Sequence, residues 1–223
     1  MEILRRASWG RVVIPVTPQP EPTMFNARVR VPGEKFLASL SGSAKINWAK
    51  RDYWRRSLVE LYKAYGGICA YSAQWIPSGT GNYSVDHFLP KASRPDLAYE
   101  WSNYRLVCLR LNGRKSNYTD VLDPFTLDDD WFHLDFDTLL IKPNATLAPQ
   151  DKESIIAAIE RLGLNDDLTF VYERASWLCC YCSGAEFTYL EQNAPFIAAE
   201  LERQGLVVNI KARCAVFASI IYV

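Results

Sequence analysis

The sequence predicts an α+β fold in which helices predominate, and three observations support this prediction. The chain has 223 residues, of which 49% are hydrophobic and 22% charged, which is close to the composition of a soluble globular protein. Apolar residues recur at intervals of three and four in several segments, as on one face of a helix. Short segments alternate between apolar and polar residues, as strands do. This composition excludes a disordered, collagen-like or coiled-coil chain.

Residues 1–42 are expected to form an extended N-terminal arm. Regular structure is interrupted there by Pro15, Pro18, Pro20 and Pro22. Residues 27–31 alternate between apolar and basic side chains, which predicts a short strand at most. From residue 47 to residue 64, large apolar side chains follow helical spacing, and Gly66 and Gly67 supply an end to that helix.

Residues 126–223 are expected to form an acidic, mainly helical layer that packs on the rest of the chain or on a partner. The layer begins with the acidic run Asp128, Asp129 and Asp130. An alternating segment follows over residues 131–141 and predicts a strand or a hairpin. The acidity of this region argues against contact with phosphates.

Helices are predicted at three further places in this layer. Residues 154–162 have helical periodicity and are followed by Gly163 as a stop, and Asn165 is a plausible N-cap for the next helix. Residues 191–204 predict another helix. The apolar residues 206–223 are interpreted either as a buried strand or as a docking surface for a partner.

The two halves of the chain carry opposite charge. Residues 1–123 contain 18 Lys and Arg against 10 Asp and Glu, a net charge of 18 − 10 = +8, and residues 124–223 contain 7 against 15, a net of 7 − 15 = −8. A basic half suits a polyanionic partner, because phosphate binding is driven largely by counterion release. Packing of the two halves against each other through complementary faces is the alternative, and composition leaves both open.

The chain has six cysteines, Cys69, Cys108, Cys179, Cys180, Cys182 and Cys214. Their spacing is not that of a small secreted disulfide framework, and no secretory signal or membrane-spanning run is evident, so a cytoplasmic protein with reduced thiols is expected. The cluster Cys179, Cys180 and Cys182 is interpreted as buried structural thiols. A thiol-dependent enzyme that uses this cluster is the alternative.

The strongest functional signal lies between residues 68 and 117. Asp86 and His87 are adjacent, Asn103 follows 16 residues after His87, and Asn112 follows 9 residues after Asn103. This order and spacing resemble the HNH nuclease pattern, in which an Asp-His pair, a middle Asn and a final Asn or His lie on a ββα-metal motif. The resemblance implies a ββα core, preceded by a basic helix, within residues 43–125.

The residue types suit the cleavage of a phosphodiester. A histidine takes a proton from water near neutral pH, while a carboxylate and an amide oxygen hold a hard cation. The resemblance implies that His87 is the general base, that Asn103 braces the loop that orients it, and that Asp86 and Asn112 bind one divalent ion. Mg²⁺ is favoured, with Mn²⁺ or Zn²⁺ as alternatives. The second histidine, His133, lies outside any motif and is expected to be structural.

A structural zinc is not expected. Many proteins with the HNH pattern hold zinc through two Cys-x-x-Cys knuckles, but here the corresponding segments are Cys69-x-x-Ser72 and Cys108-x-x-Leu111. Two cysteines without a histidine fall short of the four ligands that a structural zinc requires.

Basic residues gather around the pattern and are expected to contact the backbone of nucleic acid, with DNA favoured over RNA. They are Lys91, Arg94, Arg105, Arg110, Arg114 and Lys115. None of them forms a recognisable code for reading bases.

The resemblance extends beyond these residues to the subgroup that includes the nuclease subunit of Septu-type bacterial anti-phage systems. It is carried by residues 98–103, by Asp123-Pro124-Phe125, and by Ile159-x-x-Leu162-Gly163-Leu164-Asn165 with Arg174 further on. It implies a role in antiviral defence beside an ABC-type ATPase. A catalytically inactive nucleic-acid-binding or scaffolding subunit is the alternative.

Overall fold

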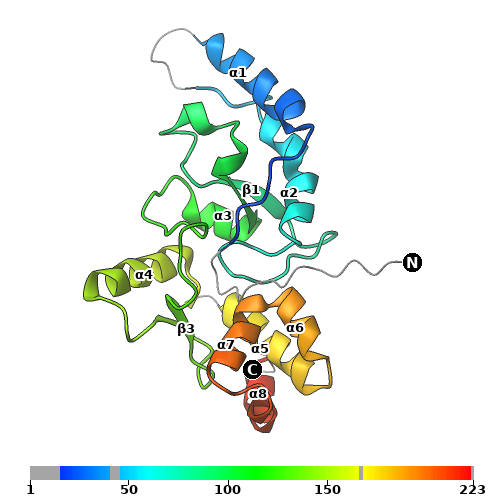
Figure 1. Ribbon diagram of the computed structural model, residues 1–223, viewed down its shortest axis with the longest axis vertical. Coiled ribbons are helices and arrows are strands. Elements are labelled where there is room, and N and C mark those ends of the chain that lie inside the picture. Colours follow the sequence, from blue (N-terminus) through cyan, green and yellow to red (C-terminus); the bar gives the residue numbers. More distant parts are fainter. Residues whose placement is uncertain (1–15, 41–45, 166–167, 222–223) are drawn as a thin grey trace.

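The computed structural model describes residues 16–40, 46–165 and 168–221. Helices and two small antiparallel sheets follow one another along an elongated molecule, with α1 at one end and α8 at the other (Figure 1). This mixture is compatible with the expected α+β class. Residues 1–15 of the expected N-terminal arm lie outside the described residues.

The described part of the arm contains a helix, so its prediction as wholly extended was wrong. A π-helical stretch, Asn26–Arg30, continues directly into α1, Val31–Ala38. Phe25 and Val29 are four residues apart and therefore share one helix face, which is buried. The Phe25 ring packs edge-on against Tyr104 at 5.7 Å between ring centroids. Burial of this face outweighs the effect of the neighbouring prolines on the chain.

Near the start of α1, an arginine side chain supplies the hydrogen bond that Pro32 cannot donate. Pro32 has no N–H, so it makes no bond to the carbonyl four residues earlier, that of Arg28. The Nη1 atom of Arg56 donates to this carbonyl at 3.0 Å. The next residue, Gly33, lies against the Tyr99 ring, where an added Cβ would come within 2.2 Å of a ring carbon. Glycine is therefore required at this contact.

The predicted helix over residues 47–64 starts later than expected. A 3₁₀ turn, Tyr53–Ser57, leads into α2, Leu58–Ala64. The predicted end is confirmed, because Gly66 and Gly67 follow with φ of 61° and 75°, which glycine adopts readily.

The first sheet consists of β1, Tyr83–His87, and β2, Tyr104–Cys108. The strands are antiparallel, with Tyr83 opposite Cys108 and His87 opposite Tyr104. The 3₁₀ turns Pro95–Leu97 and Trp101–Asn103 lie in the connection between them. Helix α3, Leu109–Lys115, follows β2 directly and buries Leu111. The chain therefore runs strand, strand, helix through residues 83–115.

The second sheet is the hairpin expected near residues 131–141. It pairs β3, Phe132–Leu134, with β4, Ile141–Pro143. Helix α4, Pro149–Leu162, begins five residues before its predicted start, with Pro149 at its first position. It ends at the predicted stop, Gly163, whose φ of 61° is left-handed.

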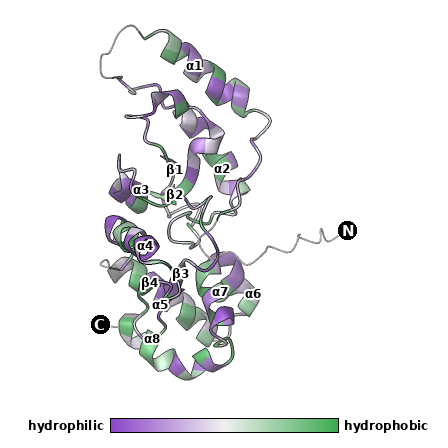
Figure 2. Cartoon of the chain, turned by 60° about the vertical axis from the view of Figure 1, so that its left-hand side comes forward, coloured by the Kyte–Doolittle hydropathy of each residue, from purple (hydrophilic) through white to green (hydrophobic). Residues whose placement is uncertain are grey.

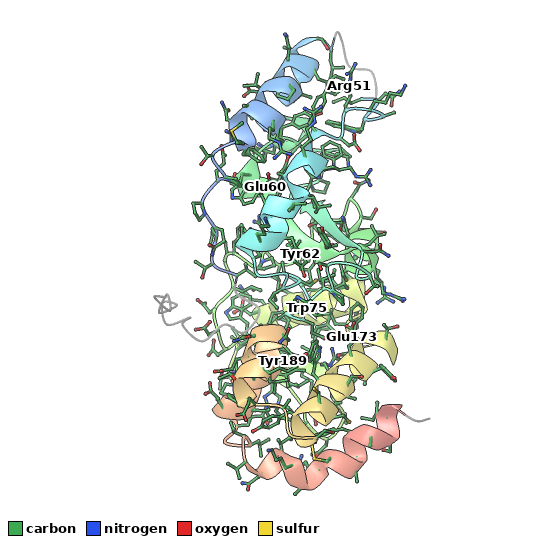
Figure 3. All side chains as sticks on the ribbon, turned by 90° about the vertical axis from the view of Figure 1, so that its right-hand side faces the viewer. Arg51, Glu60, Tyr62, Trp75, Glu173 and Tyr189 are labelled. Carbon is green, nitrogen blue, oxygen red and sulfur yellow. A yellow bond between two sulfur atoms is a disulfide. The ribbon has the colours of Figure 1, made fainter. Side chains whose placement is uncertain are left out.

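The remaining helices form the lower end of the molecule in Figure 1. They are α5, Leu168–Cys182; α6, Phe187–Asn193; α7, Pro195–Arg203; a 3₁₀ turn, Asn209–Arg213; and α8, Cys214–Ile221. The single helix predicted over 191–204 is two helices, because the chain breaks before Pro195. The backbone N–H of Trp75 donates to the Asn193 carbonyl at 2.7 Å and links this end to the first part of the chain. Figure 3 labels Trp75 above Tyr189 of α6.

The apolar C-terminal residues form a helix and not the strand that was one interpretation. Helix α8 packs on α5 and buries Phe217 completely. Much of α8 is hydrophobic, as Figure 2 shows. A disulfide between Cys182 and Cys214 joins the two helices. The expectation of buried, reduced thiols is corrected in two respects, because Cys182 is oxidised and Cys180 is exposed.

Two polar side chains fasten the second hairpin to the helices behind it. Asn165, expected to cap α5, instead bonds Ile141 of β4 in both directions, accepting from its N–H at 2.8 Å and donating to its carbonyl at 2.6 Å. Arg174 of α5 is 1% exposed and donates to the carbonyls of Leu139 and Leu164 at 2.7 and 3.0 Å. Burial lowers the pKa of Arg174 to about 10.

Within the described ranges, no helix combines the length and apolar character needed to cross a membrane.

Replacing Arg174 by Met is expected to lower the free energy of unfolding by about 3 kcal/mol, because two buried carbonyls lose their donor. Urea unfolding of the full chain measures this loss. The control is Arg213→Met, which removes an exposed pair with Asp137 and should cost at most about 1 kcal/mol. Equal losses in the two variants would contradict a structural role for Arg174.

Candidate functional site

His87 lies at the end of β1 and is held in one orientation. Its Nε2 is 2.9 Å from the Ala98 carbonyl oxygen, which also accepts a hydrogen bond from the Tyr104 hydroxyl at 2.9 Å. Because a carbonyl only accepts, Nε2 carries the hydrogen and Nδ1 carries the lone pair. The Trp54 ring stands perpendicular to the imidazole at 4.8 Å between centroids. The contacts therefore select the tautomer in which Nδ1 is the base.

The surroundings of His87 keep it neutral. The side chain is buried, with 7% of the residue exposed, and this burial lowers its pKa to about 4. The Ala98 hydrogen bond opposes the shift, while the charges of Lys91 and Lys115 add to it. At neutral pH the imidazole is in the form that accepts a proton.

Asn103 closes the connection that follows His87. Its side-chain oxygen accepts from the Leu89 N–H at 2.8 Å, and its amide nitrogen donates to the carbonyls of Leu89 and Leu97 at 3.0 and 3.2 Å. The backbone of Phe88 also donates to the Asn103 carbonyl at 2.9 Å. These bonds make Asn103 a brace for residues 88–97, the connection that follows His87.

Asp86 is enclosed by protein groups. The residue is 2% exposed, and one carboxylate oxygen accepts from the Tyr71 hydroxyl at 2.8 Å while the other accepts from Lys115 Nζ at 3.2 Å. Burial raises the pKa of Asp86, and the Lys115 charge and the Tyr71 hydrogen bond act against that rise. Neither the position of Tyr71 nor the pairing with Lys115 followed from the sequence.

The register of β1 is continuous at Asp86 and His87, so their side chains alternate in direction and face different partners. The bulge that a shared metal site would require is not present within this strand. Asn112 lies on α3, and its amide nitrogen donates to Ser84 Oγ at 2.9 Å and to the Val85 carbonyl at 3.2 Å. Asn112 therefore fastens α3 to β1.

Asp86 and Asn112, the ligands expected for a divalent ion, are not arranged to bind one. A carboxylate and an amide oxygen are suitable donors in kind. The place beside Asp86, however, is held by the ammonium group of Lys115. In the described part of the chain, no group of three or more His, Cys, Asp or Glu side chains is arranged to hold a metal ion.

Two of the six basic residues expected to contact nucleic acid are buried, and these two predictions are corrected. Arg105 is 3% exposed and forms a two-bond ion pair with Asp123 at 2.9 and 2.7 Å, with its guanidinium 3.4 Å from the centroid of the Phe125 ring. Lys115 has no exposed surface. Both side chains point inward because packing of distant segments covers them.

The other four basic residues reach the surface at different places. Lys91 is half-buried, and its Nζ lies 5.2 Å from the Trp54 ring centroid. Arg94 is exposed and paired with Asp96. Arg114 donates to the carbonyls of Leu162 and Gly163 at the end of α4, and Arg110 is exposed on α3. Lys91 and His87 both contact the Trp54 ring.

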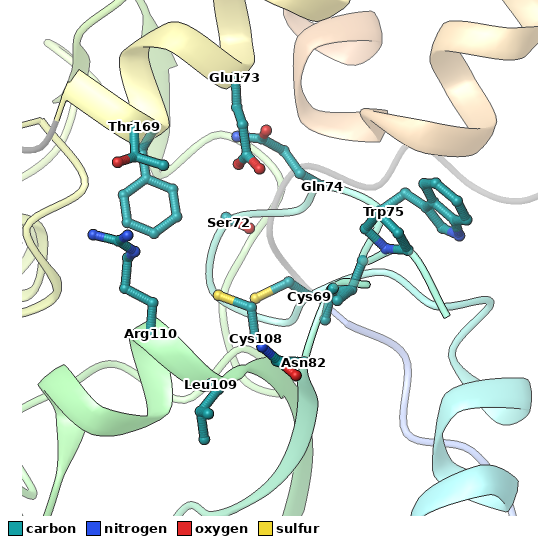
Figure 4. Close-up of a pocket in the computed structure, with 14 residues that line it drawn as sticks. Cys69, Ser72, Gln74, Trp75, Asn82, Cys108, Leu109, Arg110, Thr169 and Glu173 are labelled. Carbon is teal, nitrogen blue, oxygen red and sulfur yellow. The ribbon is translucent and has the colours of Figure 1, made fainter. Parts of the chain in front are cut away.

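Three of the four positions that correspond to the zinc knuckles lie at a separate pocket of about 500 Å³ (Figure 4). Cys69, Ser72 and Cys108 line it, and the two thiols share a hydrogen bond. Burial raises the pKa of Cys69, but hydrogen bonds from Cys108 and Ser72 outweigh it and lower the pKa to about 6, while that of Cys108 is raised. Arg110 also borders this pocket.

No model of a known protein family matches this sequence, and no curated protein matches it.

The lowered pKa of His87 predicts a loss of stability in acid. The unfolded chain takes up this proton near pH 6.5 and the folded chain only near pH 4, so stability is full above pH 6.5 and falls as the pH falls toward 4. Between pH 6.5 and pH 4, in buffer with EDTA, the free energy of unfolding of the wild type should fall by about 3 kcal/mol more than that of His87→Gln. Unfolding free energies of both proteins measure this. Parallel curves for wild type and His87→Gln would refute the assignment.

Loss of the Asn103 brace should loosen residues 88–97. The change Asn103→Ala removes three hydrogen bonds and is expected to cost about 2 kcal/mol of stability, with faster hydrogen exchange at the Leu89 amide. The matched control is Asn193→Ala, which removes one exposed bond to the Tyr189 carbonyl. Unchanged exchange at Leu89 in Asn103→Ala would show that the brace is dispensable.

Proposed function

We propose that this chain is an endonuclease of the HNH type that hydrolyses phosphodiester bonds in nucleic acid. The observation that carries the proposal is the state of His87. It is neutral, its tautomer is selected by the Ala98 carbonyl, and the connection that follows it is braced by Asn103. A histidine held in this way has Nδ1 ready to take a proton from a nucleophilic water.

A bound phosphate would strengthen His87 as a base. A pKa of about 4 leaves the imidazole neutral but weakly basic, and the negative charge of a phosphodiester raises the pKa of a neighbouring histidine. Lys91 also contacts the Trp54 ring, is half-buried, and carries a positive charge that acts on His87. In the proposed reaction its ammonium group attracts the phosphate and stabilises the charge that develops during attack.

The resemblance also implies a divalent ion, with Mg²⁺ favoured. Its expected ligands, Asp86 and Asn112, are bonded to other groups of the protein, and Lys115 stands beside Asp86. No step of the proposed reaction is therefore assigned to the ion.

The biological setting belongs to the same proposal. The resemblance to Septu-type nuclease subunits supports a role in antiviral defence, with an ABC-type ATPase as partner and DNA favoured over RNA as substrate. A partner that controls activity is in keeping with the burial of His87, since a phosphodiester reaches Nδ1 only when neighbouring side chains shift.

The proposal predicts that purified chain cleaves plasmid DNA or total RNA and that His87→Ala lowers the rate at least about 100-fold, as expected for loss of a general base. Cleavage is measured with Mg²⁺, with Mn²⁺ and with EDTA, with and without any ATPase encoded beside it. His133→Ala is the matched control, since this histidine contacts Glu200 and Arg203 far along the chain.

Equal rates for His87→Ala and wild type, with both proteins folded, would disprove the proposed role. Nucleic-acid binding without cleavage under every condition would favour the inactive binding subunit.

A further inference from the structure

Lys115 is buried without any exposed surface, which is unusual for a lysine. Its Nζ lies 3.2 Å from an Asp86 carboxylate oxygen and 2.9 Å from the His87 carbonyl oxygen. The Phe88 ring centroid is 5.8 Å from the same nitrogen. The ammonium group is thus held by two acceptors and an aromatic ring at the end of β1.

A charged side chain is tolerated in the protein interior only when it is paired with an opposite charge. Asp86 and Lys115 satisfy this requirement for each other, and the second Asp86 oxygen is taken by Tyr71. The other charged groups that act on Asp86 are also cations, Lys91 and Arg105, the latter already paired with Asp123. The chain itself therefore surrounds this carboxylate with positively charged side chains.

We propose that Lys115 is an internal competitor for divalent cations at Asp86. The inference deepens the proposed function and rests on the HNH resemblance behind it, which implies a divalent ion at this carboxylate although no step of the proposed reaction uses that ion. A hard divalent ion binds carboxylate oxygen at about 2.1 to 2.5 Å and is repelled by a nearby ammonium group. An ion at Asp86 therefore requires Lys115 to withdraw, and the resting chain binds such an ion weakly.

The position of Lys115 on α3 gives the competition a defined geometry. Asn112 lies three residues earlier on the same helix, so the two side chains share one side of α3 and both reach β1. The helix thus presents the expected amide ligand and the competing cation together. The ion pair with Asp86 and the bond to the His87 carbonyl both oppose withdrawal of Lys115.

The test measures Mn²⁺ binding to the full chain by electron paramagnetic resonance, without nucleic acid. We expect Lys115→Gln to bind Mn²⁺ at least tenfold more tightly than the wild type, and the double variant Lys115→Gln with Asp86→Asn to lose that gain. A merely structural role of Lys115 would not raise metal affinity. The matched control is Lys142→Gln, which removes an exposed lysine paired with Asp135 and should leave Mn²⁺ affinity unchanged.

Equal Mn²⁺ affinity in wild type and Lys115→Gln would overturn the inference. If Lys115→Gln does not fold, the wild type decides the question by anomalous scattering from crystals soaked in Mn²⁺. Lys115 on Asp86 with no Mn²⁺ there supports the inference, whereas Mn²⁺ on Asp86 with Lys115 displaced at low metal concentration overturns it. Neither readout depends on cleavage, so failure of the proposed nuclease activity is recognised separately.

Discussion

The region around His87 depends on one buried ion pair, between Asp86 on β1 and Lys115 on α3. Both side chains are withdrawn from water, and removing either would leave an uncompensated charge in the interior. The pair therefore fixes the helix to the end of the strand. The second bond of Lys115, to the His87 carbonyl, holds the backbone of the residue that carries the candidate base, and Tyr71 ties the preceding turn to the same carboxylate.

Burial has two consequences for His87. It removes the imidazole from water and so keeps it neutral, and the same enclosure selects one tautomer through the Ala98 carbonyl. It also limits access, since only 7% of the residue is exposed. The proposed nuclease therefore requires neighbouring side chains to move before a phosphodiester reaches the imidazole. Asn103 ties the connection that follows His87 to the start of β2 through its bonds to Leu89.

Local sequence predicted the ends of helices better than their beginnings. The stops at Gly66 and at Gly163 were predicted correctly, because each adopts a left-handed backbone that few other residues tolerate. The helical residues 26–38 were missed because the prolines that precede them, at positions 15 to 22, indicated an extended chain, whereas burial of Phe25 and Val29 decides the structure. The break before Pro195 divides a helix that apolar periodicity alone had predicted as continuous.

The sequence by itself determined the order and spacing of the polar residues from Asp86 to Lys115, because the covalent chain fixes both. Only the tertiary structure decided which of them face solvent. Arg105 and Lys115 were expected at a surface and are buried, while Cys182 and Cys214, 32 residues apart, are joined. The physical reason is that burial and pairing depend on segments distant in the chain, and one-dimensional spacing carries no information about which of these segments come together.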